Sequence, residues 1–373
     1  MIKGFKIRLF PTKEQEDIMW GHIHGCRFIW NYMINLQNIN YKNGGKYLSW
    51  IDMCKQLTIL KNECFNWLYD VSNHSLQTTI KDLDFSYKAF FNKKARYPKF
   101  KSRKNIKYAY PLRCDSIYFD KDNIKIAKLG RVKFKTNYNI KDGKDVKFLN
   151  PRISLINKKW ILSFGLECEN QTPKLTNKSM GIDLGIKETA VASFGGDVRI
   201  FHNINKSQKI QNLEKKQKHI QKIVSRKYRV NGSYEKSNNI IKYENILRGI
   251  YAKLKNIRNN YIHQITHNLI ALNPKRVVME DLNILGWIKN KHLSNAVIRQ
   301  CLGEFIRQMR YKCEWAGIEF VQVGRFYPSS KTCSRCGKIK SNLKLSDRIF
   351  ICECGLEMDR DENAARNLEK YIS

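Results

Sequence analysis

Four of the eleven cysteines stand in two close pairs near the C-terminus. Cys333 and Cys336 are separated by two residues and are followed by Gly337. This spacing is typical of a zinc knuckle, because glycine lets the turn close around the metal. Cys352 and Cys354 form the second pair, and the segment between the pairs is long enough for a short hairpin. We therefore expect the four thiolates to hold one structural zinc ion in a small ribbon.

The second cysteine pair is spaced more tightly than the first, because only one residue separates Cys352 from Cys354. Both thiolates can bind the ion through a tighter turn, and the alternative is that they are free thiols. A redox role is disfavoured because no thioredoxin-like βαβ pattern surrounds them. The other cysteines are scattered along the chain, so a disulfide framework is not expected.

The charge balance indicates a polyanionic partner. The chain of 373 residues has 69 Lys and Arg against 33 Asp and Glu, a formal net charge of +36. Such a surface attracts nucleic acid most commonly. A membrane partner is disfavoured, because no stretch approaches the ~18 apolar residues of a spanning helix and the N-terminus alternates where a signal peptide has an apolar core. We expect a cytoplasmic protein, associated with the nucleoid in a prokaryotic host.

The first half of the chain predicts a helical region inserted into a β-domain. Residues 3–9 alternate polar and apolar side chains, as a strand does. Thr12 and Gln15 have the spacing of a capping box, which opens a helical pattern that runs to about Phe91. Short alternating segments over residues 108–168 predict several strands. The N-terminal strand is expected to join them in a small sheet or barrel.

The second half predicts a mixed sheet with helices on its faces. A polar stretch at residues 171–179 marks the boundary, and three successive strands follow it. A strongly basic helix is expected at about residues 206–229, and a second helix is expected to end near Leu272. The segment at residues 294–317 reads as one continuous helix. Sequential strands followed by alternating helices and strands are typical of a mixed sheet.

Three carboxylates stand at places where catalytic sites are often found. Asp183 lies within the apolar strand GIDLG, Glu280 ends the strand RVVME, and Asp361 opens the last helix. Each has an ordinary alternative reading, since a single Asp often forms a turn and an acid at a helix start serves the helix dipole. Together they fit a magnesium site for phosphodiester hydrolysis, in which two ions about 4 Å apart share carboxylate ligands.

The same segments closely resemble a known nuclease family. GIDLG, VVMEDLNI and DRDENAARNL are similar to the catalytic segments of the RuvC-type, RNase H-like domain of TnpB proteins of insertion sequences and compact type V CRISPR effectors. IRLFPTKEQE and LDFSYKAFFNKKARYPKFKSRKN extend the resemblance over most of the chain. It implies that Asp183, Glu280 and Asp361 hold magnesium. The x1 spacing of the second cysteine pair departs from the x2 spacing usual in the family.

The resemblance also implies an architecture and partners. The fold is expected to be multidomain α+β, with an RNase H-like (RuvC) nuclease domain that carries the zinc ribbon and a small β-barrel (wedge) domain with a helical insertion. The implied partners are a guide RNA and double-stranded DNA with a short adjacent motif, so that base pairing reads the sequence. The expected segments are the first barrel strand 1–10, the helical domain 11–107, the barrel 108–172, the nuclease domain 173–326, the ribbon 327–356 and the final nuclease part 357–373.

Residues 93–107 form the densest basic segment, with eight Lys or Arg and no acid. A solvated loop is the ordinary interpretation of such a run. Its interleaved aromatics favour nucleic-acid binding instead, with phosphates on the basic side chains and bases stacked on the rings. The candidate residues are Tyr97, Lys99, Phe100, Lys101 and Arg103. Gln77 and Lys81, about one helical turn apart, are candidates for reading the adjacent DNA motif, or else part of an ordinary polar helix face.

Two alternatives to an RNA-guided DNA endonuclease remain at this stage. The first is a nuclease-inactive, RNA-guided DNA-binding regulator of transcription, which the presence of all three carboxylates disfavours. The second is a RuvC-like nuclease that uses no guide, which would not need so large a basic portion ahead of its catalytic domain.

Overall fold

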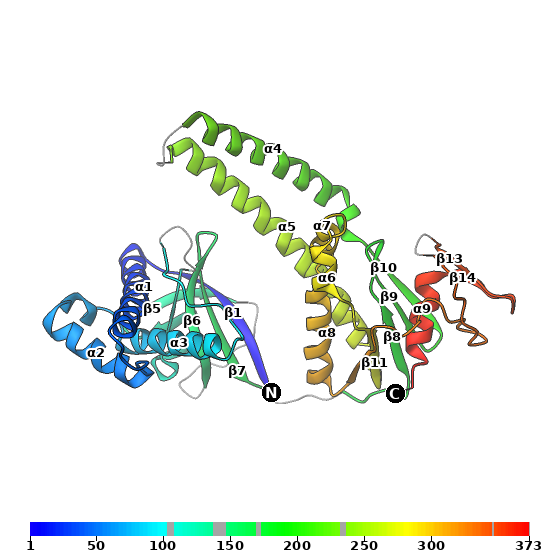
Figure 1. Cartoon of the computed structure of the whole chain (residues 1–373), viewed down its shortest axis with the longest axis horizontal. Helices are drawn as coiled ribbons and strands as arrows, with labels where there is room; N and C mark the ends of the chain where they lie inside the picture. The colour runs from blue at the N-terminus through cyan, green and yellow to red at the C-terminus, as the bar shows by residue number, and fades with distance from the viewer. Residues whose placement is uncertain (103–107, 137–146, 169–172, 232–235, 345–346, 373) are drawn as a thin grey trace. The chain divides into compact units, whose positions relative to one another are not determined.

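The computed structural model describes residues 1–102, 108–136, 147–168, 173–231, 236–344 and 347–372 (Figure 1). The chain divides into two compact units, Met1–Glu169 and Asn170–Ser373. The first unit combines helices with an antiparallel sheet, and the second combines helices with a mixed sheet and a small hairpin. The predicted α+β multidomain class is confirmed at this level.

The first unit contains a seven-stranded sheet in the order β2-β6-β7-β1-β5-β4-β3. β1 pairs antiparallel with both β7 and β5, which confirms that the N-terminal strand joins the later ones. The helices between β1 and β2 are therefore an insertion in the sheet. The strands are β1 (Ile2–Phe10), β2 (Ala109–Pro111), β3 (Ile117–Asp120), β4 (Asn123–Ile126), β5 (Gly130–Lys135), β6 (Phe148–Ile156) and β7 (Lys159–Glu167).

This sheet curls on itself. Phe119, on the edge strand β3, has its ring centre 5.6 Å from that of Phe148 on β6, although four strands stand between β3 and β6 in the sheet order. Both rings are buried. A flat sheet would hold these strands far apart, because neighbouring strands are spaced by about 4.8 Å. The concave side is therefore filled by aromatic side chains.

Three helices make up the insertion: α1 (Lys13–Lys42), α2 (Trp50–Glu63) and α3 (Asn73–Phe91). The capping box of Thr12 and Gln15 is present at the start of α1, as predicted. Met33 of α1 and Leu83 of α3 are fully buried in the same core as Ile7 of the sheet. A short 3-10 turn (Asn66–Tyr69) follows α2, and another (Cys114–Ser116) precedes β3.

The second unit is built on a five-stranded sheet in the order β10-β9-β8-β11-β12. β8 (Ser179–Asp183), β9 (Glu188–Phe194) and β10 (Asp197–His202) are antiparallel, whereas β11 (Arg276–Glu280) and β12 (Glu319–Val323) run parallel to β8. The mixed sheet predicted from the sequence is confirmed. Because β8 and β11 are parallel neighbours, their carboxyl ends meet at one edge.

Helices cover both faces of this sheet (Figure 1). Met180 and Ile182 of β8 pack on one face against α5 (Asn238–Ile270) and α8 (Leu302–Ala316). On the other face, Val278 of β11 packs with Leu368 of α9 (Arg360–Glu369). Because side chains alternate along a strand, one face of the sheet packs into a large apolar core and the other packs into a smaller apolar cluster under α9.

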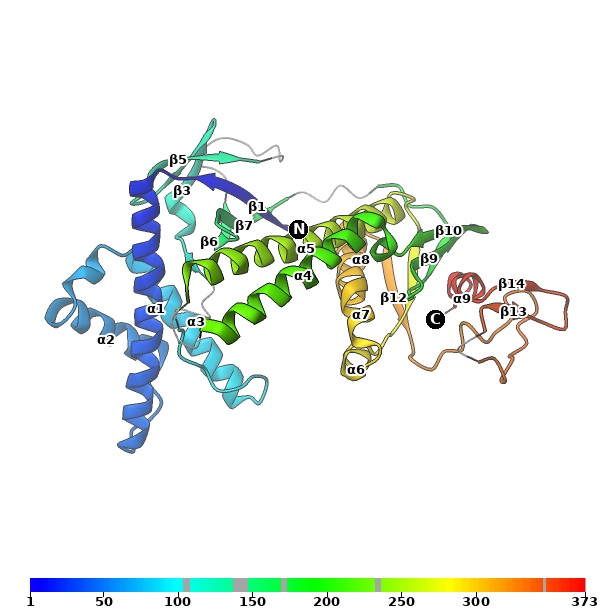
Figure 2. The ribbon, with the colours of Figure 1, turned by 90° about the horizontal axis from the view of Figure 1, so that it is seen from above.

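Two long helices form an antiparallel arm. α4 (Gln208–Asn231), preceded by a short 3-10 turn (Ile204–Lys206), lies beside the first half of α5, as both ribbon views show (Figures 1 and 2). An apolar seam that includes Ile220 and Leu247 joins the two helices. Within the described ranges, none of the helices combines the length and the apolar character that a bilayer crossing requires.

The helix predicted over residues 294–317 is wrong in one respect, because the structure breaks it at Cys301. α7 (Ser294–Gln300) ends and α8 begins at this residue, which has the left-handed conformation φ 54°, ψ 37°. The bend lets Val297 and Leu302 both enter the core. It also leaves the buried Gln300 amide donating to the Ile186 carbonyl, a long-range contact that the helical pattern does not encode. α6 (Ile284–Lys289) precedes this pair.

The cysteine-bearing segment connects β12 to α9. It contains one short hairpin, β13 (Ile349–Ile351) and β14 (Glu357–Asp359), and an isolated bridge between Thr332 and Ile339. Phe350 and Leu356 are buried in a small core of its own. β14 leads directly into α9, so the end of the hairpin fixes where that helix begins.

Candidate metal and catalytic centre

Asp183 and Glu280 lie next to each other at the carboxyl ends of two parallel strands. The register of β8 and β11 pairs Ile182 with Met279, so Asp183 and Glu280 follow at the next position of each strand. Residues in register on neighbouring strands share a face of the sheet. Asp361 lies in the first turn of α9, the helix that covers this face. The structure thus brings together the three carboxylates that the sequence singled out.

Gly181, which the sequence analysis missed, sets the distance between β8 and α9. It lies two residues before Asp183 and therefore on the same face of the strand. A Cβ at this position would lie 2.1 Å from the carbonyl oxygen of Ala365 and 2.2 Å from the backbone nitrogen of Glu369. Only glycine lets the helix backbone pack this closely. The signal was present in the sequence as a glycine inside a strand, which often marks a close backbone approach.

Burial and like charge raise the pKa of acids at this centre. Burial is the largest cause that raises the pKa of Asp183 well above its usual range, and the charges of Glu280 and Asp361 raise it further. Burial also raises the pKa of Glu280, which the hydrogen bond from Ser329 Oγ partly offsets. Like charges held together in a partly buried place favour the protonated forms unless a cation neutralises them.

Arg360 partly offsets the negative charge of these acids. Arg360 Nη2 lies 3.4 Å from Asp361 Oδ1, and Arg360 opposes the rise in the pKa of Asp183. Asp359 is used differently, because its Oδ1 accepts the backbone N–H groups of Asp361 and Glu362 at 2.8 and 3.4 Å and so caps α9. The expected helix-start role therefore fits Asp359, whereas the charge of Asp361 acts on Asp183.

The donor atoms of the three acids suit a hard divalent cation, since carboxylate oxygens are the ligands that magnesium prefers. They do not form a closed site for a single ion. Among the residues that the structure describes, only the cysteines form a group of three or more His, Cys, Asp or Glu side chains whose ligand atoms all lie within 4.8 Å of one another. The three carboxylates are not part of such a group.

The four cysteines already have the geometry of a tetrahedral metal site. Cys333 Sγ lies 3.6 Å from Cys354 Sγ, and Cys336 Sγ lies 3.6 Å from Cys352 Sγ. A zinc–sulfur bond of about 2.3 Å in a tetrahedron separates the sulfurs by about 3.7 Å. The tighter second pair therefore brings both of its sulfurs to the cluster, although it departs from the usual spacing. The residues fit a structural metal ion.

The backbone around the cysteines supports thiolate ligands. Burial raises the pKa of the Cys333 thiol, but hydrogen bonds from the backbone N–H groups of Cys336 and Arg335 and from the Cys336 and Cys352 side chains together lower this pKa to about 6. Gly337 and Gly355, with φ of 77° and 81°, close the turns after the two pairs in a conformation that side chains rarely adopt. Each glycine thus allows its loop to fold its N–H groups toward the sulfurs.

Two buried asparagines of α9 attach the cysteine loop to the helix. Asn363 accepts the N–H of Ser334 at 2.9 Å and donates to the carbonyl of Thr332 at 2.7 Å, so its amide holds both neighbours of Cys333. Asn367 donates to the carbonyls of Ser329 and Thr332 at 2.7 and 2.6 Å. The sequence marks these asparagines as polar residues within a helix, but nothing in it names their partners.

Gln77 and Lys81 flank an aromatic side chain that the sequence analysis did not single out. The indole N–H of Trp50 donates to the Gln77 carbonyl at 3.4 Å, and Lys81 Nζ lies 5.5 Å from the centre of a Trp50 ring. Trp50 is 36% exposed. The two candidates therefore belong to a small surface on α2 and α3 that contains an ammonium group and an accessible ring.

The basic segment has two kinds of side chain. Lys99 and Phe100 are exposed, as expected for nucleic-acid contacts. Tyr97 donates its hydroxyl to Asn38 Oδ1 at 2.5 Å and packs edge-on against Tyr87. Lys101 points inward, with its Nζ 3.5 Å from the centre of a Trp30 ring, and burial lowers its pKa to about 8. Arg103 lies outside the described residues.

Trp30 and Asn31 of α1 explain why this segment is held in place. The Trp30 indole donates to the Lys99 carbonyl at 3.0 Å, and the Asn31 amide exchanges two hydrogen bonds with the backbone of Lys101, at 3.0 and 2.7 Å. The segment is thus fixed on α1 by its backbone while the Lys99 side chain remains outside.

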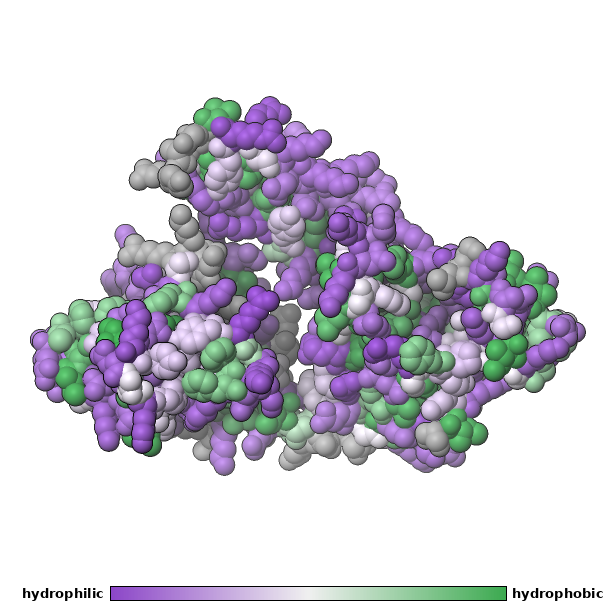
Figure 3. Space-filling view, in the orientation of Figure 1, coloured by the Kyte–Doolittle hydropathy of each residue, from purple (hydrophilic) through white to green (hydrophobic). Residues whose placement is uncertain are grey.

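The α4–α5 arm carries the second basic surface. Exposed side chains at Lys209, Lys215, Lys216, Lys218, Lys222, Arg226 and Arg229 follow α4. The only acid of α4, Glu214, is paired with Arg258 at 2.7 Å and with Arg299 at 3.3 Å. Hydrophilic side chains cover much of the arm on the face shown in Figure 3. The exposed charge of α4 is therefore wholly positive, since its acid is neutralised locally.

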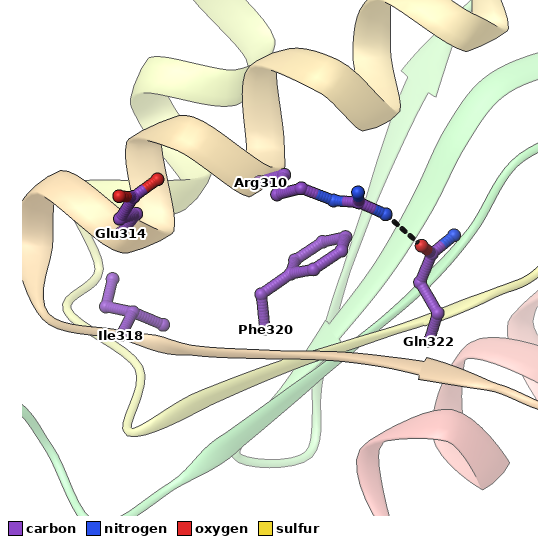
Figure 4. A pocket seen from close by; sticks show the side chains of 5 residues that line it. All are labelled: Arg310, Glu314, Ile318, Phe320 and Gln322. Carbon is purple, nitrogen blue, oxygen red and sulfur yellow. Dashed lines mark hydrogen bonds between the residues drawn. The ribbon is translucent and has the colours of Figure 1, made fainter. Parts of the chain in front are cut away.

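A surface pocket of about 340 Å³ lies away from the carboxylates (Figure 4). It is lined by Arg310 and Glu314 of α8 and by Ile318, Phe320 and Gln322 beside or on β12. Arg310 donates to the Gln322 side chain and lies over the Phe320 ring. Phe320 packs with the core under α8, so the pocket lies on the face of the sheet opposite to α9. It contributes nothing to the candidate catalytic centre.

Three family models match the chain. One described as a probable transposase, OrfB_IS605, matches residues 163–291. A helix-turn-helix domain of the same group matches residues 1–46, which here form β1 and α1. The TNB domain of Cas12f1-like proteins matches residues 303–368, the range that contains the cysteine cluster.

Similar proteins and structures agree with these matches. InsQ of Escherichia coli (strain K12), named as an RNA-guided DNA endonuclease, is 31% identical over 98% of this chain and 91% of its own length. The endodeoxyribonuclease Cas12f1 of Sulfoacidibacillus thermotolerans is 29% identical over 56% of this chain and 50% of its own. In fold, the chain is similar to Cas12f1 in a cryo-EM complex with sgRNA and target DNA, with a TM-score of 0.60, 17% identity and coverage of 99% of both chains.

Proposed function

Because the chain belongs to the TnpB-like family of RNA-guided DNA endonucleases, we propose that it cuts double-stranded DNA at sites chosen by a bound guide RNA. The family resemblance drawn from the sequence motifs is confirmed by the identity to InsQ over nearly the whole chain. The convergence of Asp183, Glu280 and Asp361 carries the catalytic part of the proposal. Without these acids the chain would be a nucleic-acid-binding scaffold.

The second unit fits an RNase H-like (RuvC) nuclease domain. Its strand order β10-β9-β8-β11-β12, with an antiparallel meander followed by two parallel strands, supports this assignment. In it the first catalytic acid ends the central strand and the second ends its parallel neighbour. The final helix α9, which covers this face of the sheet, supplies the third acid. Each acid therefore belongs to a regular helix or strand.

We propose that the three acids hold magnesium. Ions bound there would stabilise the charge that develops on the phosphate and lower the pKa of the attacking water. Asp183, whose pKa is raised by burial and then by the charges of Glu280 and Asp361, would hold magnesium together with those two acids. Ser329 orients Glu280 by donating a hydrogen bond to Oε1, and Asp359 fixes the first turn of α9 and thereby the position of Asp361.

The cysteine cluster is proposed to hold structural zinc. Cys333, Cys336, Cys352 and Cys354 would close a site with four sulfur ligands, which leaves no open position for catalysis. The ion would fix the turn from which Ser334 and Thr332 bond to Asn363. Zinc therefore supports the position of α9 and takes no part in the reaction.

The remaining domain assignments are also proposals. The curled sheet of the first unit fits the β-barrel (wedge) domain, and α1–α3 fit the helical domain inserted in it. The exposed Lys99, Phe100 and the α4 lysines are proposed to bind phosphates and bases of the guide RNA and target DNA. Gln77 and Lys81, together with Trp50, are proposed to contact the DNA motif beside the target.

The test is to purify the chain with its own nucleic acid and sequence what is bound. A single RNA species of defined sequence is expected. The loaded protein should then cut a DNA duplex that matches this RNA in the presence of magnesium and leave a scrambled duplex intact. Cleavage of both duplexes would indicate a guide-independent nuclease, and binding without cleavage would indicate a nuclease-inactive regulator.

A further inference from the structure

Residues 328–334 form a short strap between the cysteine cluster and Glu280. At one end of the strap, Ser329 is 2% exposed and donates its hydroxyl to Glu280 Oε1. At the other end, Cys333 is 1% exposed and contributes its sulfur to the cluster. Only three residues separate the two. Because the connection is so short, a displacement of the cysteine turn should also displace Ser329.

The strap is held along its length by α9. The Asn367 amide donates to Ser329 and Thr332, and the Asn363 amide joins the backbone on both sides of Cys333. Both asparagines are buried, with exposures of 5% and 0%. Buried amides that have found partners are costly to displace, because their groups would lose hydrogen bonds without regaining water. The strap and the helix thus move as one body.

We propose that Ser329, Asn363 and Asn367 are positioning residues that couple the metal-filled cysteine cluster to the orientation of Glu280. The inference rests on the proposed function, because it takes Glu280 as a ligand of the catalytic magnesium. It adds a role for the zinc that goes beyond folding of the ribbon. Zinc occupancy fixes the strap, the strap fixes the Ser329 hydroxyl, and the hydroxyl fixes which Glu280 oxygen faces Asp183.

The expected size of the effect follows from hydrogen bonds to metal ligands in general. Removing such a partner typically weakens metal binding by about 10- to 100-fold. Ser329→Ala removes the hydroxyl but leaves the Ser329 carbonyl for Asn367, so the strap itself should stay in place. Ser329→Thr keeps a hydroxyl and should restore binding. Ser330→Ala, a change of the same kind at the next and less buried residue, is the matched control.

The first measurement is Mn²⁺ binding to the full-length, RNA-free chain, followed by the EPR signal of free Mn²⁺. Asp183→Ala defines the background from sites other than the carboxylates. We expect about 10-fold weaker Mn²⁺ binding in Ser329→Ala and in Asn367→Ala, with zinc still present at one per chain. Wild-type affinity is expected in Ser330→Ala and close to it in Ser329→Thr. The double variant Ser329→Ala/Asn367→Ala should lose no more Mn²⁺ affinity than either single variant, since both substitutions interrupt the same series of contacts.

The second measurement is zinc release to a colorimetric chelator with and without saturating Mg²⁺. Coupling between two sites is reciprocal in binding free energy, so Mg²⁺ should lower the fraction of zinc that the chelator removes from the wild type at equilibrium and should not lower it in Ser329→Ala. Unchanged Mn²⁺ affinity in Ser329→Ala, additive losses in the double variant, or zinc release that ignores Mg²⁺ in the wild type would each overturn the coupling. If wild type bound no more Mn²⁺ than Asp183→Ala, the carboxylate metal site itself would be refuted.

Discussion

The three carboxylates near α9 lie close together, whereas most described lysines and arginines of the basic segment 93–107 point into solvent. Asp183, Glu280 and Asp361 come from three separate elements and converge, although burial, and then the charges of Glu280 and Asp361, raise the pKa of Asp183. In the basic segment, the side chains of Lys93, Lys94, Arg96 and Lys99 are all exposed to solvent. Lys101 differs from these four described side chains, since it lies over Trp30.

This difference separates two kinds of binding. Charges that are forced together at an energetic cost are useful only if a compact ion of opposite sign neutralises them, as a divalent metal does. Charges that spread over a surface suit an extended polyanion, whose phosphates are several ångströms apart. Lys101 shows that membership of a basic run does not by itself leave a side chain exposed to solvent.

The largest expected effect tests the convergent group directly. Asp183→Ala removes one metal ligand and should lower DNA cleavage by on the order of 10³-fold or more, as loss of an essential catalytic group usually does. Guide RNA and target binding should stay near wild type, because the exposed basic surfaces are untouched. Asp197→Ala, which removes an exposed acid at the start of β10, is the control. Loss of binding in Asp183→Ala would instead make this acid structural.

The next effect tests whether convergence depends on the cysteine cluster. Cys336→Ser should lose the zinc that elemental analysis is expected to find at one per chain, and it should lower the yield of folded protein, because structural zinc contributes directly to folding. Cys64→Ser changes another exposed cysteine outside the cluster and should do neither. Full zinc content in Cys336→Ser would show that the cluster does not use all four sulfurs. The same comparison with Cys354→Ala tests the tighter pair.

Much of the convergent site was predictable from the sequence because its chemistry restricts residue type and position. A carboxylate within an apolar strand or at a strand end, and cysteines at short spacing, are rare unless they have a ligand. The partners of these residues were not predictable. Gly181 matters because of a helix 180 residues later in the chain, and Ser329 matters because of a hydrogen bond to Glu280. Neither contact leaves a local pattern.

The fold shows the same division. Local patterns predicted the capping box at Thr12, the alternating strands and the end of α3. They failed at Cys301, where the periodicity of residues 294–317 continues through a left-handed residue. The break is decided by tertiary packing of Val297 and Leu302, and helix propensity is a weak guide where packing dominates. The inward turn of Lys101 was missed for a similar reason, since Trp30 is 71 residues away in the sequence.

A smaller effect tests how much the close approach of the three carboxylates destabilises the folded protein. Because the pKa values of Asp183 and Glu280 are raised in the folded state, stability is highest when these groups are protonated and falls as the pH rises through their folded pKa values. In protein freed of divalent metal, Asp183→Asn should therefore raise the melting temperature at pH 7. The gain is expected to be a few degrees, given about 2–4 °C per kcal/mol for a unit of this size. It should shrink toward zero below the ordinary pKa of Asp, and saturating Mg²⁺ should reverse it. A lower melting temperature at every pH would show that the carboxylate stabilises the fold by itself.

The smallest effect separates the two lysines of the basic segment, which the sequence treated alike. Lys99→Ala removes an exposed ammonium, so a plot of log affinity against log salt should flatten by about 0.9 for a duplex contact or about 0.7 for a single strand. Lys101→Ala should leave this slope unchanged and lower thermal stability instead, because it removes a cation–π contact worth about 0.5–2 kcal/mol. Both effects should be independent of target sequence, since phosphates carry none. If Lys101→Ala flattened the salt plot as much as Lys99→Ala, the ammonium would have to leave Trp30 on binding. Both lysines would then contact nucleic acid, and the difference between the exposed Lys99 and the half-buried Lys101 would not hold in the complex.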